Sequence, residues 1–452
     1  MSSISARLRA LLDLRPGEGA MSAWAALAFF AIMTGYSVLR PLRDAAGIDG
    51  DPAFIPWLWT VTSIVMLAIA GPWGALVARV PRRRLMAISF RAFTVQHVAF
   101  IGLFASAWQP LIIGRVFYVW LSVFNLFVVS VFWSVCADLA RPEQGRRLFG
   151  PIAIGGSAGA ILGPILTRSL ATHVEAWVLL AISAIFLELA VWAMWMVERH
   201  SARVTTVSTS STGATADAAD AEARRTAKAV GGHPLQGLAN LVRSPYLAGI
   251  AGYVMCASCL ATFVYLTQAH IAKDALPDRA TRTQFFAEVD LYAGLATIVL
   301  QALVTSRALR WLGAGVVLAA LPLVQGGGLI GLVAAPSLAM ATAVSASGRA
   351  VQHALSRPAR ELLFTAVARE DRFKTKNVID TFVYRLADTG SSWLHRALTT
   401  AGMALTTVAI PLTSAWIGLS LLLGIGHRRR TAEAGEATAP SSLPAAVARR
   451  RG

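Results

Sequence analysis

The sequence predicts an all-α membrane protein, with twelve transmembrane helices arranged as two six-helix bundles. The composition supports this class, because 56% of the 452 residues are hydrophobic and only 14% are charged, against about 25% charged residues in soluble proteins. Apolar stretches of about 20 residues, the length that crosses a bilayer, recur along the whole chain. A polar segment at 198–245 divides these stretches into two sets of six.

The apolar stretches define the expected spans. They are residues 22–40, 55–78, 85–106, 109–137, 148–171, 174–197, 246–270, 286–305, 311–333, 336–356, 377–398 and 403–426. The expected organisation is a cytoplasmic N-terminus at 1–20, an N-terminal six-helix bundle at 21–197, a linker at 198–245, a C-terminal six-helix bundle at 246–426 and a tail at 427–452. The linker and the tail contain too little apolar surface to fold, so we expect a flexible linker and a disordered basic tail.

The positive charge is concentrated on one side of the predicted membrane. The chain carries 41 Lys and Arg residues against 24 Asp and Glu residues, which gives a net charge of +17. Most of the basic residues lie at the termini, in the linker and in the loops at 79–84, 139–147, 305–310 and 356–376. Because cytoplasmic loops are enriched in Lys and Arg, we expect a multi-pass protein of the inner membrane with both termini in the cytoplasm. Topology accounts for the charge, so no nucleic-acid partner is expected.

Regularly spaced glycines mark one face of the fifth span. Gly155, Gly159 and Gly163 follow one another at four-residue steps, which places them on the same side of a helix. In a bilayer, small residues of this kind let two helix backbones approach closely. We therefore expect these three glycines to form a helix-packing face.

Two arginines and a carboxylate lie where the first span ends. Arg40, Arg43 and Asp44 surround Pro41, which ends or kinks a helix and frees backbone polar groups. Arg40 and Asp44 are four residues apart, a spacing that allows an ion pair on one helix face. One interpretation is a substrate-binding or gating cluster. The other is a pair of arginines that reach from a helix end to the membrane surface.

Two further arginines lie within counterpart spans of the two halves. Arg115 is in the fourth span, followed by Asn125, and Arg349 is in the tenth. Charged residues inside membrane helices are costly and are often functional. Two arginines facing a shared central cavity favour an anionic substrate, since a guanidinium group matches a carboxylate or a phosphate. The alternative is that each arginine forms an internal ion pair that only holds helices together.

The eleventh span also carries several ionisable residues, namely Asp380, Arg385 and Asp388. Arg385 and Asp388 are three residues apart, which is close enough to pair on one helix face. A carboxylate that loses and regains an arginine partner can couple transport to protons or to substrate. A permanent pair would be structural, and the sequence leaves both interpretations open.

Motifs for catalysis or for cofactor binding are not visible. The sequence contains no P-loop and no H-E-x-x-H zinc motif. The three cysteines, Cys136, Cys256 and Cys259, lie in apolar stretches and indicate no disulfide framework. We therefore expect no metal, no cofactor and no enzymatic activity.

Several short motifs resemble those of a known transporter group. The first is Arg40-Pro-Leu-Arg43-Asp44, which is similar to an R-D-T-K-D-like element at the end of span one. The others are Phe132-Trp133, Arg146-Arg147-Leu148-Phe149-Gly150, Lys376-Asn-Val-Ile-Asp380 and Arg385-Leu-Ala-Asp388-Thr-Gly390. On these motifs the chain resembles bacterial facilitator-type transporters related to the plastid- and bacterial-type ATP/ADP translocases. The resemblance implies the twelve-helix major facilitator (MFS) fold.

Two positions depart from the pattern of the translocases. Asp388 stands where they have Lys, and Asp138 stands where they have Asn. Our first hypothesis is a secondary active transporter that moves a small anionic solute across the inner membrane by alternating access. The second is an ATP/ADP-type nucleotide exchanger. The third is a membrane scaffold or sensor that does not transport, for which the central region would be packed shut. The expected partners are a small solute and the lipid bilayer, and the oligomeric state stays open.

Overall fold

The computed structural model describes residues 18–79, 82–106, 108–139, 142–209, 236–367, 371, 375–376 and 378–438, and these residues form helices and short connections without strands. The N-terminal half contains α2 (Glu18–Gly47), η1 (Pro52–Phe54), α3 (Ile55–Arg79), α4 (Arg82–Ala105), α5 (Pro110–Leu139), α6 (Pro142–Leu170) and α7 (Ala176–Thr209). The C-terminal half contains α9 (Gln236–Arg243), α10 (Pro245–Ala275), α11 (Arg279–Leu300), η2 (Gln301–Thr305), α12 (Ser306–Ala334), α13 (Leu338–Val351), η3 (Gln352–Ser356), α14 (Arg357–Thr365), η4 (Ile379–Val383), α16 (Tyr384–Thr400) and α17 (Thr406–Thr438).

The described helices account for the twelve predicted spans. Nine helical segments of the described ranges are long and apolar enough to cross a membrane. One of them, Arg279–Ala334, contains two spans, because Gly313 interrupts it with a φ of 75° that glycine adopts without strain. Two more polar segments, 338–365 and 379–400, form the remaining spans. The all-helical fold expected from the sequence is therefore confirmed.

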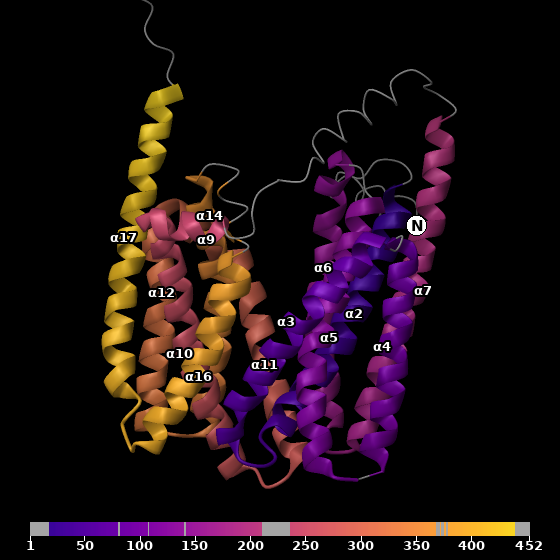
Figure 1. Ribbon diagram of the computed structural model, residues 1–452, viewed down its shortest axis with the longest axis horizontal. Helices are drawn as coiled ribbons and strands as arrows, with labels where there is room; N and C mark the ends of the chain where they lie inside the picture. Colours follow the sequence, from indigo (N-terminus) through magenta and orange to yellow (C-terminus); the bar gives the residue numbers. More distant parts are fainter. Residues whose placement is uncertain are drawn as a thin grey trace, which may run out of the picture.

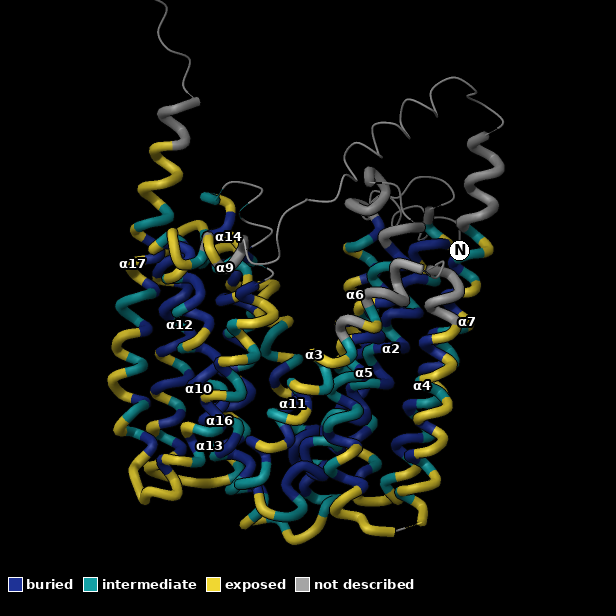
Figure 2. Tube along the Cα trace, in the orientation of Figure 1, coloured by how far each residue is buried: buried dark blue, intermediate teal, exposed yellow. Residues whose placement is uncertain are grey.

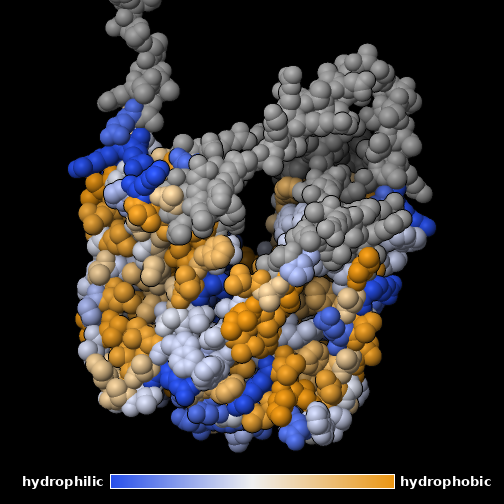
Figure 3. All heavy atoms as spheres, in the orientation of Figure 1, coloured by the Kyte–Doolittle hydropathy of each residue, from blue (hydrophilic) through white to orange (hydrophobic). Residues whose placement is uncertain are grey.

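Each half has its own hydrophobic core. Phe117 and Phe132 are fully buried in the N-terminal half, and Phe263 and Trp416 are fully buried in the C-terminal half. Figure 2 shows the buried residues along the inner faces of the helices and the exposed ones along the outer faces. Hydrophobic side chains cover much of the visible outer surface of both halves, and hydrophilic ones gather at its lower edge (Figure 3). This pattern fits helices whose outer faces are surrounded by lipid.

The two halves touch at one end, which we call the closed end. There a third core cluster joins Ile48 and Ile55 of the N-terminal half to Leu266, Phe286 and Val289 of the C-terminal half. Figure 1 shows the helices of the two halves side by side at this lower end and spread apart at the upper end, towards which α7, α9 and α17 extend. The two halves are therefore in contact at the closed end and separated at the opposite end.

The helix ends differ in part from the predicted boundaries. Helix α7 continues to Thr209, and α9 occupies 236–243, so both enter the segment expected to be a flexible linker. Helix α17 runs to Thr438, so the first part of the predicted disordered tail is helical. The rest of both segments, and residues 1–17, lie outside the described residues.

The glycine face of α6 packs against α2. A Cβ atom at Gly155 or Gly159 would overlap the carbonyl oxygens of Ala26 or Phe30, and one at Gly163 would overlap Ser37. The side chain of Thr167, one turn further on, donates a hydrogen bond to the Val38 carbonyl at 2.9 Å. The backbones of the two helices are thus in contact along this face. This packing holds the last turns of α2, which carry Arg40 and Arg43, in a fixed position relative to α6.

Candidate functional site

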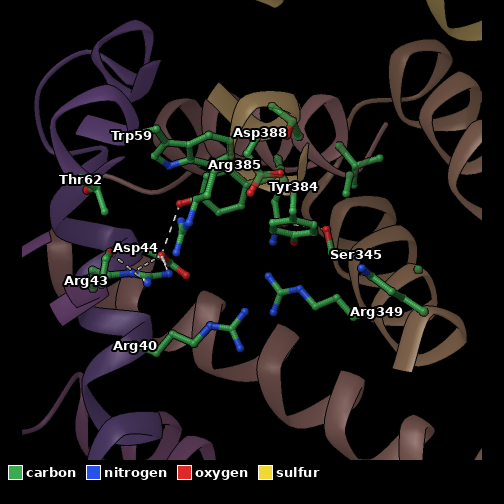
Figure 4. Close-up of a pocket in the computed structure, with 18 of the residues that line it drawn as sticks. Arg40, Arg43, Asp44, Trp59, Thr62, Ser345, Arg349, Tyr384, Arg385 and Asp388 are labelled. Atoms are coloured by element: carbon green, nitrogen blue, oxygen red, sulfur yellow. Dashed lines mark hydrogen bonds and ion pairs between the residues drawn. The ribbon is translucent and has the colours of Figure 1, made fainter. Parts of the chain in front are cut away.

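A polar cavity of about 380 Å³ lies between the two halves. Helices α2, α3 and α5 line it from the N-terminal half, and α10, α12, α13, η3, α14 and α16 line it from the C-terminal half. Figure 4 shows Arg40 and Arg349 reaching into this space from opposite halves. The central region is therefore hollow rather than packed shut, contrary to what a scaffold without transport would require.

Most of the charged residues that line the cavity are arginines. They are Arg40, Arg43, Arg349, Arg357 and Arg385, against the carboxylates of Asp44 and Asp388. One further carboxylate, Asp290, lies in contact with this set. Cations exceed anions among these groups when all are ionised, so the cavity provides a positive potential for a negatively charged ligand.

Asp290 of α11 connects the arginines of the two halves. Its Oδ2 lies 3.6 Å from Nε of Arg40 on α2, and its Oδ1 is paired with Arg349 on α13. The Asp290 side chain is only 6% exposed, so the two guanidinium groups, rather than water, compensate its charge. Asp290 was missed from the sequence, although a carboxylate inside the predicted span 286–305 was a signal that could have identified it.

Arg43 and Asp44 form a second ion pair in the cavity wall. Nη2 of Arg43 lies 2.6 Å from Oδ1 of Asp44. The sequence spacing allowed Arg40 to pair with Asp44, but Arg40 instead pairs with Asp290. The reason is tertiary, since α11 of the C-terminal half packs directly against α2 and offers a carboxylate across the interface.

Aromatic residues surround the Arg43–Asp44 pair. The guanidinium carbon of Arg43 lies 5.1 Å from the centre of the Tyr118 ring. The Tyr118 hydroxyl accepts a hydrogen bond from Trp59 Nε1 at 2.7 Å, and Tyr265 of the C-terminal half donates one to Asp44 at 3.3 Å. Trp59 also stacks on Tyr265, with ring centres 5.7 Å apart. This part of the cavity wall therefore places the guanidinium group of Arg43 beside the aromatic rings of Tyr118, Trp59 and Tyr265.

Asp388 and Arg385 both line the cavity, but they do not pair with each other. Asp388 accepts a hydrogen bond from Ser258 of α10 at 2.5 Å. In the part of the chain that the structure describes, Arg385 makes no ion pair or hydrogen bond. The ion pair that their three-residue spacing allowed is therefore not formed, and Ser258 of a neighbouring helix is the partner of Asp388 instead. Asn125 lines the same cavity from α5.

Two π-helical turns lie next to the cavity. The segment η3 begins three residues after Arg349 and carries Gln352 and His353, which line the cavity. The segment η4 ends immediately before Tyr384, another lining residue. Single π-helical turns inside longer helices occur often at functional sites, because they turn side chains away from the regular helical positions.

Two of the predicted site residues lie outside the cavity. Arg115 packs on Phe54, with 3.7 Å between its guanidinium carbon and the ring centre. Asp380 pairs with Arg360 of α14 at 3.2 Å, on the far side of the cavity from the closed end. The expectation that Arg115 and Arg349 share one cavity is wrong, because Arg115 lies near the closed end under η1.

A cluster around Asp49 holds the halves together at the closed end. Its carboxylate accepts hydrogen bonds from Arg279 and from Arg282 of α11, the second at 2.9 Å. Lys273 Nζ donates to the Asp49 carbonyl at 2.5 Å. The side chains of Asp49 and Arg282 are 13% and 6% exposed, so these contacts are shielded from water. The cluster bridges the halves beside the third core cluster.

The chemistry of the site is that of binding rather than of reaction. Guanidinium, hydroxyl and amide groups converge on one space from both halves. Among the described residues, no group of three or more His, Cys, Asp or Glu side chains lies close enough to hold a metal ion. The arrangement suits an anion held by several charge-assisted hydrogen bonds.

Comparisons with known proteins agree with the architecture. The sequence model of the Major Facilitator Superfamily matches residues 24–360. Among curated proteins, the multidrug resistance protein MdtG of Salmonella choleraesuis (strain SC-B67) is 28% identical over 154 residues, which are 32% of this chain and 37% of that relative. The MdtG protein of Salmonella arizonae (strain ATCC BAA-731 / CDC346-86 / RSK2980) has the same identity over the same length. The chain thus aligns with little more than a third of these relatives.

Solved structures share the fold over nearly the whole chain. A POT family transporter in complex with 5-aminolevulinic acid has a TM-score of 0.60 at 12% identity, covering 90% of this chain and 96% of that chain. The nucleoside transporter NupG has a TM-score of 0.59 at 11% identity, covering 91% and 99%. At such low identity, these likenesses bear on the fold alone.

Proposed function

The chain belongs to the Major Facilitator Superfamily, and we propose that it moves a small anionic solute across the inner membrane by alternating access. One observation carries the proposal: arginines from both halves converge on one cavity, and Asp290 is shared between them. A solute bound there contacts both halves at once, as alternating access requires.

The side chains of the cavity support an anion in particular. Arg357 and Arg385 line the cavity without a hydrogen bond or an ion pair to any described residue. A guanidinium group in a partly water-excluded site attracts a carboxylate or a phosphate, with which it forms two parallel hydrogen bonds. A cavity of about 380 Å³ is at the small end of the range for ligand pockets, so it suits a metabolite-sized solute.

The arrangement of the halves supports an inward-open state. The Asp49 cluster and the third core cluster join the halves at the closed end, while Figure 1 shows them apart at the end towards which α7 and α17 extend. The positive-inside rule assigns that second end to the cytoplasm. The solute would then reach the cavity from the cytoplasm in this state, and opening of the closed end would release it outside.

The ATP/ADP-exchanger hypothesis remains a second candidate. The similarity of Arg40–Asp44 and of Arg385–Gly390 to translocase motifs favours it. Asp388 argues against it, because a carboxylate on the cavity wall repels nucleotide phosphates. The two candidates differ in the size and charge of the solute, so binding measurements separate them.

The test is a thermal-shift screen of the purified protein against carboxylates, phosphates, ATP and ADP, with neutral and cationic compounds of similar size. We expect at least one small anion to raise the unfolding temperature, and Arg349→Ala to abolish that shift. Arg115→Ala is the matched control, since it removes an arginine outside the cavity and should keep the shift. Stabilisation by neutral or cationic compounds alone would refute the proposal. Stabilisation by ATP and ADP, followed by their exchange in proteoliposomes, would favour the second candidate.

A further inference from the structure

An apolar groove runs along the outside of the N-terminal half. It has a volume of about 810 Å³ and lies between α3, α4 and α5. Helix α4 packs mainly on α5 and α7 and leaves α3 largely uncovered, which opens the groove towards the lipid. Its walls are apolar apart from Ser89, Gln96 and Arg115. Val61, Ile88 and Val116 of these walls are each more than 40% exposed.

Arg115 is the single cation that lines this groove in the described part of the chain. It is the sixth residue of α5, which places its Cα about 8 Å along the axis from the start of that helix. Its guanidinium packs flat on Phe54, but makes no ion pair or hydrogen bond to any described residue. The donor groups of Arg115 are therefore available at the end of an otherwise apolar channel.

We propose that this groove binds one phospholipid, with an acyl chain along α3, α4 and α5 and the lipid phosphate on Arg115. Three features together point to this occupant. The groove is apolar over most of its length and opens to the bilayer, it carries one unpaired cation, and that cation lies close to a helix end, from which a long side chain can reach lipid headgroups. A free anionic metabolite would match the cation but not the apolar walls.

The lipid site is separate from the solute cavity. Arg115 does not line the cavity, and the arginines of the cavity do not line the groove. Helices α3 and α5 contribute to both, through Trp59 and Tyr118 on the cavity side and Val61 and Val119 on the groove side. A bound lipid would support these two helices from the outside, whether or not the protein transports an anion.

The test is native mass spectrometry of the detergent-purified protein titrated with phosphatidylglycerol. Diacylglycerol with the same acyl chains provides a probe without phosphate. We expect one tightly bound phosphatidylglycerol, and Arg115→Gln should weaken its binding about tenfold, the effect of losing one charge-assisted contact. Ala92→Trp should also weaken it, because Ala92 lines the groove and a larger side chain would fill it.

Arg310→Gln is the matched control. Arg310 is an exposed arginine that, like Arg115, lies next to an aromatic ring, 5.7 Å from the centre of Trp311, but it does not line the groove. Its substitution should leave phosphatidylglycerol binding unchanged. Unchanged binding in Arg115→Gln, or equally tight binding of diacylglycerol, would overturn the proposal. A dimer that Ala92→Trp dissociates would also overturn it, since the groove would then contact a second copy of the chain.

Discussion

Arg40 and Asp290 form an ion pair across the two halves of the chain, with 3.6 Å between Nε and Oδ2. Arg349 binds the other oxygen of the same carboxylate. Asp290 thus occupies the position that an anionic solute would take between the two arginines. In this view the carboxylate keeps Arg40 and Arg349 in place while the cavity is empty, and a bound anion competes with it.

Replacing Asp290 by Asn should therefore strengthen anion binding. The change removes the competing negative charge but keeps the shape of the side chain. We expect the dissociation constant of the anion found by thermal shift to fall about fivefold, equivalent to about 1 kcal/mol. Isothermal titration calorimetry measures this directly. Glu288→Gln is the control, because Glu288 lies on the same helix but pairs with Arg168 at 3.0 Å, outside the cavity. Weaker binding by Asp290→Asn would mean that the carboxylate orients the arginines rather than competing for them.

Replacing Asp49 by Asn should loosen the closed end. The substitution removes the carboxylate that Arg279 and Arg282 share. A loss of about 2 kcal/mol would shift the ratio of outward-open to inward-open molecules about 30-fold. Spin labels at Thr172 and Ala404, which are exposed loop residues at this end of the two halves, would report the opening as a longer distance by pulsed electron spin resonance.

The matched control for this change is Glu175→Gln. Glu175 is an exposed carboxylate at the same end and has no ion pair to the described residues of the other half. The control should leave the distance distribution unchanged. An unaltered distribution in Asp49→Asn would show that the third core cluster alone closes this end.

Replacing Gly159 by Ala should destabilise the N-terminal half. The added methyl group would overlap the Phe30 carbonyl of α2, so the two helices would have to separate. We expect a loss of about 1–3 kcal/mol, the usual effect of overpacking, visible as a lower unfolding temperature in detergent. Gly150→Ala is the control on the same helix, since no atom lies within 4 Å of its added methyl group. Equal unfolding temperatures for both variants would contradict direct packing of α6 on α2.

Replacing Asp388 by Asn should remove any dependence of uptake on a proton gradient. Asp388 lines the cavity, and among the described residues its recorded contact is a hydrogen bond from Ser258 rather than an ion pair. A carboxylate in this position can take up a proton without breaking a salt bridge. Uptake by proteoliposomes with an imposed pH difference measures the effect. Asp380→Asn should retain the dependence, since Asp380 pairs with Arg360 outside the cavity. A pH dependence that persists in Asp388→Asn would assign coupling to another group.

The sequence predicted the elements of the fold better than the contacts of the site. Hydropathy located the spans because each crosses the same thickness of lipid and must be apolar over that length. Spans ten and eleven were also found, although they are too polar for a strict hydropathy criterion. Arg40, Arg43, Arg349, Arg385 and Asp388 were identified because charged residues inside spans are rare.

The partners of those residues could not be read from spacing. Arg40 pairs with Asp290 rather than Asp44, and Asp388 binds Ser258 rather than Arg385. Each actual partner lies on a helix far away in the sequence. Spacing along the sequence shows which residues share a face of one helix. These contacts join different helices, so they depend on how the helices pack against one another.

The sequence by itself determined the fold class and the presence of charges within the membrane, because both follow from the cost of placing polar groups in lipid. Only the tertiary structure decided that five arginines line one cavity, that Asp290 lies between two of them and that Arg115 belongs to an outer groove. These features depend on the crossing of α11 over α2 and on the separation of α4 from α3, which are set by packing between distant segments and not by any local pattern.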